Sequence, residues 1–169
     1  MQRMRNQGVV LETRAPRRLN CTMEVMSKRD WDCLDRRVST VIVGDNCCNE
    51  ESLTKLDLSG FVNLRELKVG SECFVNVKEV TLAELSELES VEIGSKSFVV
   101  LKGSSDDLNG RFHLKNCPKL QSLTIGDYSF SFYSVIEIKH VDALEVIEIS
   151  KGNVHCYNFR YASLELKSD

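Results

Sequence analysis

The sequence lacks the short patterns that mark most enzymes and the long apolar runs that mark membrane proteins. It contains no H-E-x-x-H, no G-x-S-x-G and no phosphate-binding glycine loop. No apolar run is long enough to cross a membrane, and the residues near Met1 lack the apolar core of a signal peptide. We therefore expect a protein that is not an enzyme, holds no cofactor and has no membrane span. An intracellular location is favoured.

Metal-binding and redox patterns are also missing. The seven cysteines form no C-x-x-C pair, and no histidine lies at ligand spacing from the adjacent Cys47 and Cys48. His155 and Cys156 are neighbours in an expected strand, so their side chains point to opposite faces and cannot form a nucleophile–base pair. An odd number of cysteines without a secretory signal favours reduced thiols.

Positive charge is scarce outside the first part of the chain. The formal net charge is −3, which argues against nucleic-acid binding because that usually needs a basic face. Residues 1–37 carry nine Lys and Arg against five Asp and Glu, whereas the rest of the chain carries thirteen against twenty. We interpret residues 1–37 as a basic leader with a short helical cap. A targeting segment or a nucleic-acid arm are the alternatives for the leader.

What the chain does contain is a repeat. Residues 64–74 (LRELKVGSECF), 88–98 (LESVEIGSKSF) and 120–130 (LQSLTIGDYSF) are near copies of one another, with weaker echoes at 38–44 and 144–150. The glycine of each copy recurs about every 24 residues, with one insertion of roughly eight. A fixed period of this length is the signature of a repeat architecture.

Each unit contains two short segments in which apolar and polar residues alternate. Strict alternation with β-branched residues predicts half-buried strands, and no stretch has the 3.6-residue period of a helix. Two strands per unit predict a mainly β protein, a parallel β-solenoid over residues 38–169. The expected inward-facing residues are Leu64, Leu67, Val69, Leu88, Val91, Ile93, Leu120, Leu123, Ile125, Leu144, Ile147 and Ile149 in the first segments, and Leu56, Leu58, Val80, Leu82, Phe112, Leu114, Ile136, Ile138, Leu164 and Leu166 in the second.

Further positions repeat around the glycine. Phe74, Phe98 and Phe130 lie four residues after it and are expected to stack as an aromatic ladder inside the corner. A small residue precedes each phenylalanine and suits a tight bend. The glycine itself is expected to supply the positive φ that turns the chain out of the sheet.

The run I/V-G-x-x-S/C-F-x-x-V/Y-x-x-V/I, at residues 69–80 and 125–136, resembles the leucine-rich repeat of the BspA-like (Treponema-type) subclass. The resemblance covers roughly residues 38–166. It implies a curved solenoid used for protein recognition and adhesion, with no catalytic residues. The chain departs from the subclass in lacking the I-P that follows the first strand and a leader for secretion.

Two segments lie outside the regular units. Residues 23–37 contain Ser27-x-x-Asp30, a variant of the capping box, followed by Trp31 and Leu34. This pattern predicts a short helix laid over the first unit. Residues 99–110 (VVLKGSSDDLNG) are interpreted as a surface loop insertion. Its two adjacent aspartates lack the ligand count of a calcium loop.

The outward positions of the second segments form the candidate binding surface. In-register stacking predicts a column of lysines beside a mostly acidic column. An ordinary solvated face is the favoured interpretation of this charged strip, and the functional alternative is a recognition surface whose lysines meet an acidic protein partner. The members of the strip are His113, Lys115, Glu137, Lys139, Glu165 and Lys167.

Three functional hypotheses follow. The favoured one is a non-catalytic leucine-rich-repeat scaffold for protein–protein recognition through the sheet surface and the loop insertion. The second is a β-solenoid enzyme acting on polysaccharide, with its catalytic groups around Glu137, Lys139 and Glu165. The third is a truncated or degenerate fragment of a repeat family. Because no unit follows the strand at residues 163–166, self-association through this edge is also expected.

Overall fold

A computed structural model describes residues 21–100, 109–150 and 157–167. The mainly β architecture expected from the alternation is confirmed, and no helix in these ranges is long and apolar enough to cross a membrane. The described residues form one helix, α1 (Lys28–Asp32), and the strands β1 (Thr22–Val25), β2 (Thr40–Val43), β3 (Lys55–Asp57), β4 (Glu66–Val69), β5 (Glu79–Ala83), β6 (Ser90–Ile93), β7 (Gly110–Lys115), β8 (Ser122–Ile125), β9 (Tyr133–Lys139), β10 (Val146–Ile149) and β11 (Ser163–Lys167).

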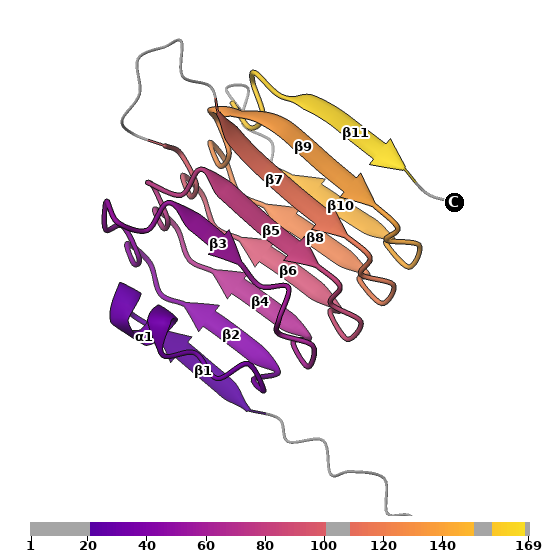
Figure 1. Cartoon of the computed structure of the whole chain (residues 1–169). Coiled ribbons are helices and arrows are strands. Elements are labelled where there is room, and N and C mark those ends of the chain that lie inside the picture. The colour runs from indigo at the N-terminus through magenta and orange to yellow at the C-terminus, as the bar shows by residue number, and fades with distance from the viewer. Residues whose placement is uncertain (1–20, 101–108, 151–156, 168–169) are drawn as a thin grey trace, which may run out of the picture.

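The strands form two parallel sheets that lie face to face (Figure 1). One sheet has the order β1-β2-β4-β6-β8-β10 and the other the order β3-β5-β7-β9-β11. Each repeat unit contributes one strand to each sheet, and equivalent residues of successive units are paired. Leu67, for example, lies beside Val91, and Val80 lies beside Phe112. The register expected from the repeat is therefore confirmed in the described strands.

One apolar core fills the space between the sheets. The expected inward-facing residues are buried from Leu56 through Ile138, as alternation on a half-buried strand predicts. The corner after the second strand of each unit is filled by Phe61, Leu85 and Cys117, which are also buried. Burial ends at the last two strands, β10 and β11, whose large apolar residues are exposed.

The aromatic ladder is confirmed. The ring of Phe98 lies between those of Phe74 and Phe130, with centroid distances of 5.1 Å and 4.8 Å and nearly parallel planes. Phe159 continues the stack at 5.5 Å from Phe130, and the edge of Trp31 meets Phe74 at 5.1 Å. Stacked and T-shaped contacts are favourable between aromatic rings, so the ladder joins the successive turns that carry Phe74, Phe98, Phe130 and Phe159.

The small residues before the phenylalanines form a hydrogen-bonded ladder. Ser97 Oγ accepts from the Cys73 N–H at 3.1 Å and donates to Gly70 O at 2.9 Å. Ser129 Oγ repeats both contacts one unit later, accepting from the Ser97 N–H at 3.1 Å and donating to Gly94 O at 2.7 Å. Because both buried hydroxyls have partners, they carry no unsatisfied hydrogen-bonding groups. Serine therefore suits these positions because it can form these hydrogen bonds as well as because it is small.

The expected role of the repeat glycine is wrong. Gly70, Gly94 and Gly126 do not have a positive φ. The left-handed residues of each turn are the second and fourth after the glycine, such as Lys96 (φ 57°) and Phe98 (φ 59°). A Cβ at Gly94 would lie 2.5 Å from the carbonyl carbon of Gly70. Close approach of stacked turns, rather than reversal of the chain, therefore explains the glycine.

Replacing Gly94 with alanine should destabilise the fold. The new methyl group would meet main-chain atoms of Gly70 and Ser71 at 2.5–2.7 Å. Overpacking of this kind costs about 1–3 kcal/mol of unfolding free energy, which urea denaturation measures. Gly60→Ala is the matched control, because its nearest neighbours belong to the flexible side chain of Arg36. An equal loss in both variants would contradict the close-approach explanation.

A short helix forms where the capping pattern predicts it. Ser27 is the N-cap of α1, and its Oγ accepts from the Asp30 N–H at 3.3 Å. Trp31 and Leu34 pack against the core as partly buried residues. Strand β1, which was not predicted, pairs in parallel with β2. The residues just before the helix thus also belong to the sheet.

Most of the predicted loop insertion lies outside the described residues, because the structure describes only Val99, Val100 and residues 109–110 of it. β7 begins at Gly110, the last residue of that segment. A Cβ at Gly110 would lie 2.6 Å from the ring of Tyr133. The buried Tyr133 hydroxyl donates to Val77 O at 2.7 Å. The insertion therefore re-enters the sheet against a buried tyrosine. Residues 1–20 of the expected basic leader are also outside the described ranges.

Candidate functional site

The charged strip lies across β7, β9 and β11. Its six predicted residues occupy two columns of paired positions, as the repeat register requires. The paired positions are His113 with Glu137, Glu137 with Glu165, Lys115 with Lys139, and Lys139 with Lys167.

Glu137 is the centre of the strip. Its carboxylate contacts Lys115 Nζ at 2.5 Å, His113 Nδ1 at 2.9 Å and the Nζ of Lys139. The hydrogen bonds from Lys115 and Lys139 lower the pKa of Glu137 to about 2, because they stabilise the ionised carboxylate. The Glu137 side chain is only 16% exposed. It is therefore an ionised, largely covered acceptor for its neighbours.

Glu165 links the remaining lysines. Its carboxylate contacts Lys139 Nζ at 3.1 Å and Lys167 Nζ at 2.5 Å, and the hydrogen bonds from Lys167 and Lys139 lower its pKa. Each lysine of the strip is thus paired with a glutamate of the neighbouring column. The geometry describes a cross-strand ion-pair network, which leaves little uncompensated positive charge for an acidic partner.

The same contacts bear on the hypothesis of a polysaccharide enzyme. Glycoside hydrolysis commonly uses a carboxylic acid with a raised pKa to protonate the leaving group. Glu137 and Glu165 both have lowered pKa values. The strip therefore supplies no general acid from these two residues at neutral pH.

The ion pairs of Glu137 should make the free energy of unfolding depend on pH in the acid range. The folded-state pKa of about 2 lies below the ordinary 4.5. Pairing therefore stabilises the protein above pH 4.5 and loses this effect as the pH falls from 4.5 to 2. The stability difference between wild type and Glu137→Gln, measured in urea, should shrink over that window. Glu92→Gln, on β6 of the other sheet, is the control. A Glu137→Gln difference that stays constant down to pH 2 would contradict the pairing.

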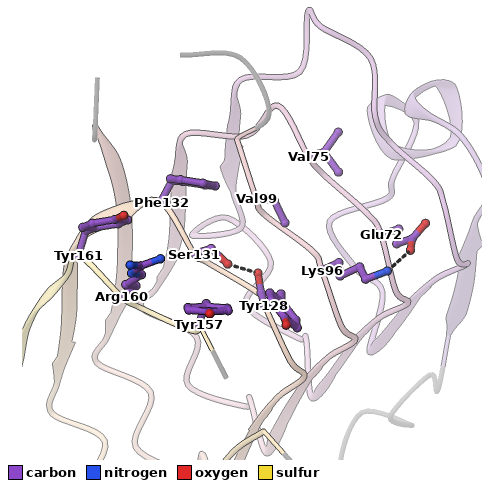
Figure 2. Close-up of a pocket in the computed structure, with 10 residues that line it drawn as sticks. All are labelled: Glu72, Val75, Lys96, Val99, Tyr128, Ser131, Phe132, Tyr157, Arg160 and Tyr161. Carbon is purple, nitrogen blue, oxygen red and sulfur yellow. Dashed lines mark hydrogen bonds and ion pairs between the residues drawn. The ribbon is translucent and has the colours of Figure 1, made fainter. Parts of the chain in front are cut away.

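A second surface, the corner groove, lies along the turns beside the aromatic ladder and was not predicted from the sequence (Figure 2). It has a volume of about 550 Å³. Its lining residues are Glu72, Val75, Lys96, Val99, Tyr128, Ser131, Phe132, Tyr157, Arg160 and Tyr161.

The corner groove is assembled from equivalent positions of four units. Backbone hydrogen bonds hold the turns in register: Lys96 N–H donates to Asp127 O at 2.7 Å, and Glu72 N–H donates to Ser95 O at 2.8 Å. One row consists of the residues two before each ladder phenylalanine, and the other of the residues one or two after it. The rows are Glu72, Lys96, Tyr128 and Tyr157 on one side, and Val75, Val99, Ser131, Phe132, Arg160 and Tyr161 on the other.

Aromatic side chains gather at one end of the groove. The rings of Tyr128 and Tyr157 lie 5.4 Å apart, and those of Phe132 and Tyr161 lie 6.2 Å apart and nearly parallel. The guanidinium carbon of Arg160 lies 5.0 Å from the Tyr157 ring centroid and 5.4 Å from that of Tyr161. Phe132 and Tyr161 are 40% and 46% exposed. Exposed aromatic clusters of this kind are typical of recognition surfaces.

The other end of the groove is polar at its rim. Lys96 Nζ pairs with Glu72 Oε1 at 3.1 Å. Val75 and Val99 lie on the other row of the same two units as this ion pair, and the Ser131 hydroxyl donates to a carbonyl of its own turn (Figure 2). One end of the groove thus has an ion pair on one row and two valines on the other, and the opposite end is aromatic and carries a cation.

The turn positions carry a sequence signal of their own. The glycine, the small residue and the phenylalanine recur from unit to unit, whereas the residue two before the phenylalanine changes from Glu72 and Lys96 to Tyr128 and Tyr157. Repeat proteins form extended binding surfaces from stacked equivalent positions. Comparing the three regular units turn by turn could therefore have found the part of the groove formed by Glu72, Lys96 and Tyr128.

Several thiols of the described residues are buried. Burial raises the pKa of Cys48 to about 12 and those of Cys73 and Cys117 to about 11, and buried thiols of this kind are poor nucleophiles. The described ranges contain no group of three or more His, Cys, Asp or Glu residues that could hold a metal ion. No family model, curated protein or solved structure matches the chain.

Proposed function

We propose that this protein is a non-catalytic leucine-rich-repeat solenoid that recognises a protein partner through the corner groove. The period of about 24 residues, the two parallel strands per unit and the glycine–phenylalanine pattern support the repeat assignment. The observation that carries the binding role is the exposed aromatic cluster around Arg160, held in one groove by stacked turns.

The residue types in the groove favour a protein ligand. Tyrosine, phenylalanine and arginine are enriched in protein interfaces, and tyrosine and arginine are common among the residues that dominate binding energy. Binding of an acidic partner by the charged strip stays a prediction. The ion pairs of the strip also connect neighbouring strands of the sheet.

The experiment compares capture by a groove variant and a strip variant. The groove variant is Phe132→Ser/Tyr161→Ser, and the strip variant is Lys115→Gln/Lys167→Gln. Wild type and the strip variant should capture the same protein from a native lysate, identified by mass spectrometry. The groove variant should capture at least tenfold less of it, while still unfolding cooperatively with a thermal midpoint lowered by only a few degrees. The exposure of Phe132 and Tyr161 makes that midpoint a fair control for folding.

Two outcomes would contradict the proposal. A partner lost only by the strip variant would assign recognition to the sheet face. Release of reducing ends from a polysaccharide, abolished by Glu137→Gln, would contradict the non-catalytic assignment and favour the enzyme hypothesis.

A further inference from the structure

The corner groove has a regular pitch. Its rows advance by one unit at a time, so equivalent side chains are about 4.8 Å apart, and those two units apart are separated by about 9.6 Å. A polyproline II helix has three residues per turn and rises about 3.1 Å per residue, which places residues i and i+3 about 9.3 Å apart on one face. The spacing of every third residue in a polyproline II helix therefore nearly matches the spacing of every second unit along the groove. Four units span about 14 Å, the length of about five residues in this conformation.

We propose that the corner groove binds a proline-containing segment in the polyproline II conformation, with prolines at i and i+3 and an acidic residue against Arg160. This inference rests on the proposed function, because it names the kind of segment that the protein partner presents. Other conformations fit the pitch less well. Residues on one face of an extended strand are about 6.7 Å apart. An α-helix, at about 5.4 Å per turn, falls out of step by about 2 Å over the groove.

The chemistry of the groove suits proline. Aromatic-lined grooves are the surfaces that recognise polyproline II segments, whose conformation is already formed before binding and so loses little entropy. Lys96 is paired with Glu72, and the Ser131 hydroxyl is used within its own turn. These two polar groups are therefore engaged within the protein. Val75 and Val99 add apolar surface in the two units farthest from Arg160.

Arg160 provides the charge complementarity. Within the described residues its guanidinium contacts the rings of Tyr157 and Tyr161 and has no carboxylate in ion-pair range. An arginine held against aromatic faces keeps its planar N–H groups available for a carboxylate, which it can bind through two parallel hydrogen bonds. An acidic side chain beside the proline pair would satisfy this group.

The direct test measures fluorescence anisotropy of labelled peptides with the full chain. The probe contains a Glu-Pro-Ala-Ala-Pro core, and a second probe places the glutamate after the proline pair, since the groove does not fix the direction of the segment. At least one of the two should bind. Replacing both prolines with alanine should weaken binding at least tenfold, and replacing the glutamate with glutamine should weaken it about tenfold.

Arg160→Gln provides the signature that simple loss of folding would not give. This variant should bind the glutamate and glutamine probes equally, while keeping a preference for the prolines. Arg111→Gln, an exposed position on β7 outside the groove, should behave as wild type. A glutamate preference that survives in Arg160→Gln would overturn the proposed role of Arg160.

A displayed random-peptide library separates this inference from the proposed function. Enrichment of peptides with prolines three residues apart, lost with the Phe132→Ser/Tyr161→Ser variant, supports both. Groove-dependent peptides without paired prolines would overturn the polyproline inference and leave protein recognition standing. The absence of groove-dependent peptides, or groove-dependent binding on a glycan array instead, would overturn both.

Discussion

Phe98→Ala should lower the free energy of unfolding by about 3–5 kcal/mol, the range found when a buried aromatic ring is removed from a core. The Phe98 side chain is 2% exposed, and its ring stacks on both Phe74 and Phe130. Alanine would leave a cavity in the middle of the ladder. The hydrogen-bonded turns above and below limit how far the structure can collapse into it. Urea denaturation with linear extrapolation measures the change.

Phe132→Ala is the matched control for this experiment. The chemical change is the same, but the Phe132 side chain is 40% exposed at the edge of the corner groove. Its loss should cost about 1 kcal/mol or less. Equal destabilisation by the two substitutions would mean that Phe98 is not the centre of the core, and the ladder register would then be wrong.

The strand faces were predictable because alternation reports burial directly. Leu67, Val91 and Leu123 could be placed in one column from their spacing alone, and the pairing of their strands agrees. β1 could not be found in this way, since it precedes the first unit and has no copy in the repeat. The glycine role also escaped prediction. A positive φ and a close backbone approach both select glycine, and only coordinates distinguish them.

The position of the charged strip was predictable from the sequence, but its ion-pair network was not. The repeat register placed Lys115 and Lys139 on neighbouring strands, but it could not predict the side-chain rotamers that bring both lysines into contact with Glu137.

The corner groove escaped prediction for a different reason. Phe159, the fourth ring of the ladder, lies nine residues after Ser150, whereas the other ladder phenylalanines lie four residues after their glycine. The turn that carries Arg160 therefore does not match the pattern that identifies the others.

The isolated chain should self-associate through the edge formed by β10 and β11. In the described residues these strands end their sheets, and each has a neighbour on one side only. Val146, Ile147, Leu164 and Leu166 are between 44% and 58% exposed. An entirely apolar cavity of about 170 Å³ lies between the two strands. An open edge beside exposed apolar side chains is an arrangement that natural proteins usually cover or interrupt with charge.

Sedimentation velocity across a range of concentrations should show the wild-type chain changing from monomer to dimers or larger species. The double variant Leu164→Lys/Leu166→Lys places two charges on the exposed apolar surface of β11 and should shift the distribution toward monomer. Val62→Lys is the matched control, because Val62 is 54% exposed and lies in the turn after β3, at the far end of the same sheet. This control should associate like the wild type. A wild-type chain that stays monomeric at high concentration would contradict the prediction. Equal effects of the edge and control variants on association would contradict it too. Either result would show that the β10–β11 edge does not drive contact between chains.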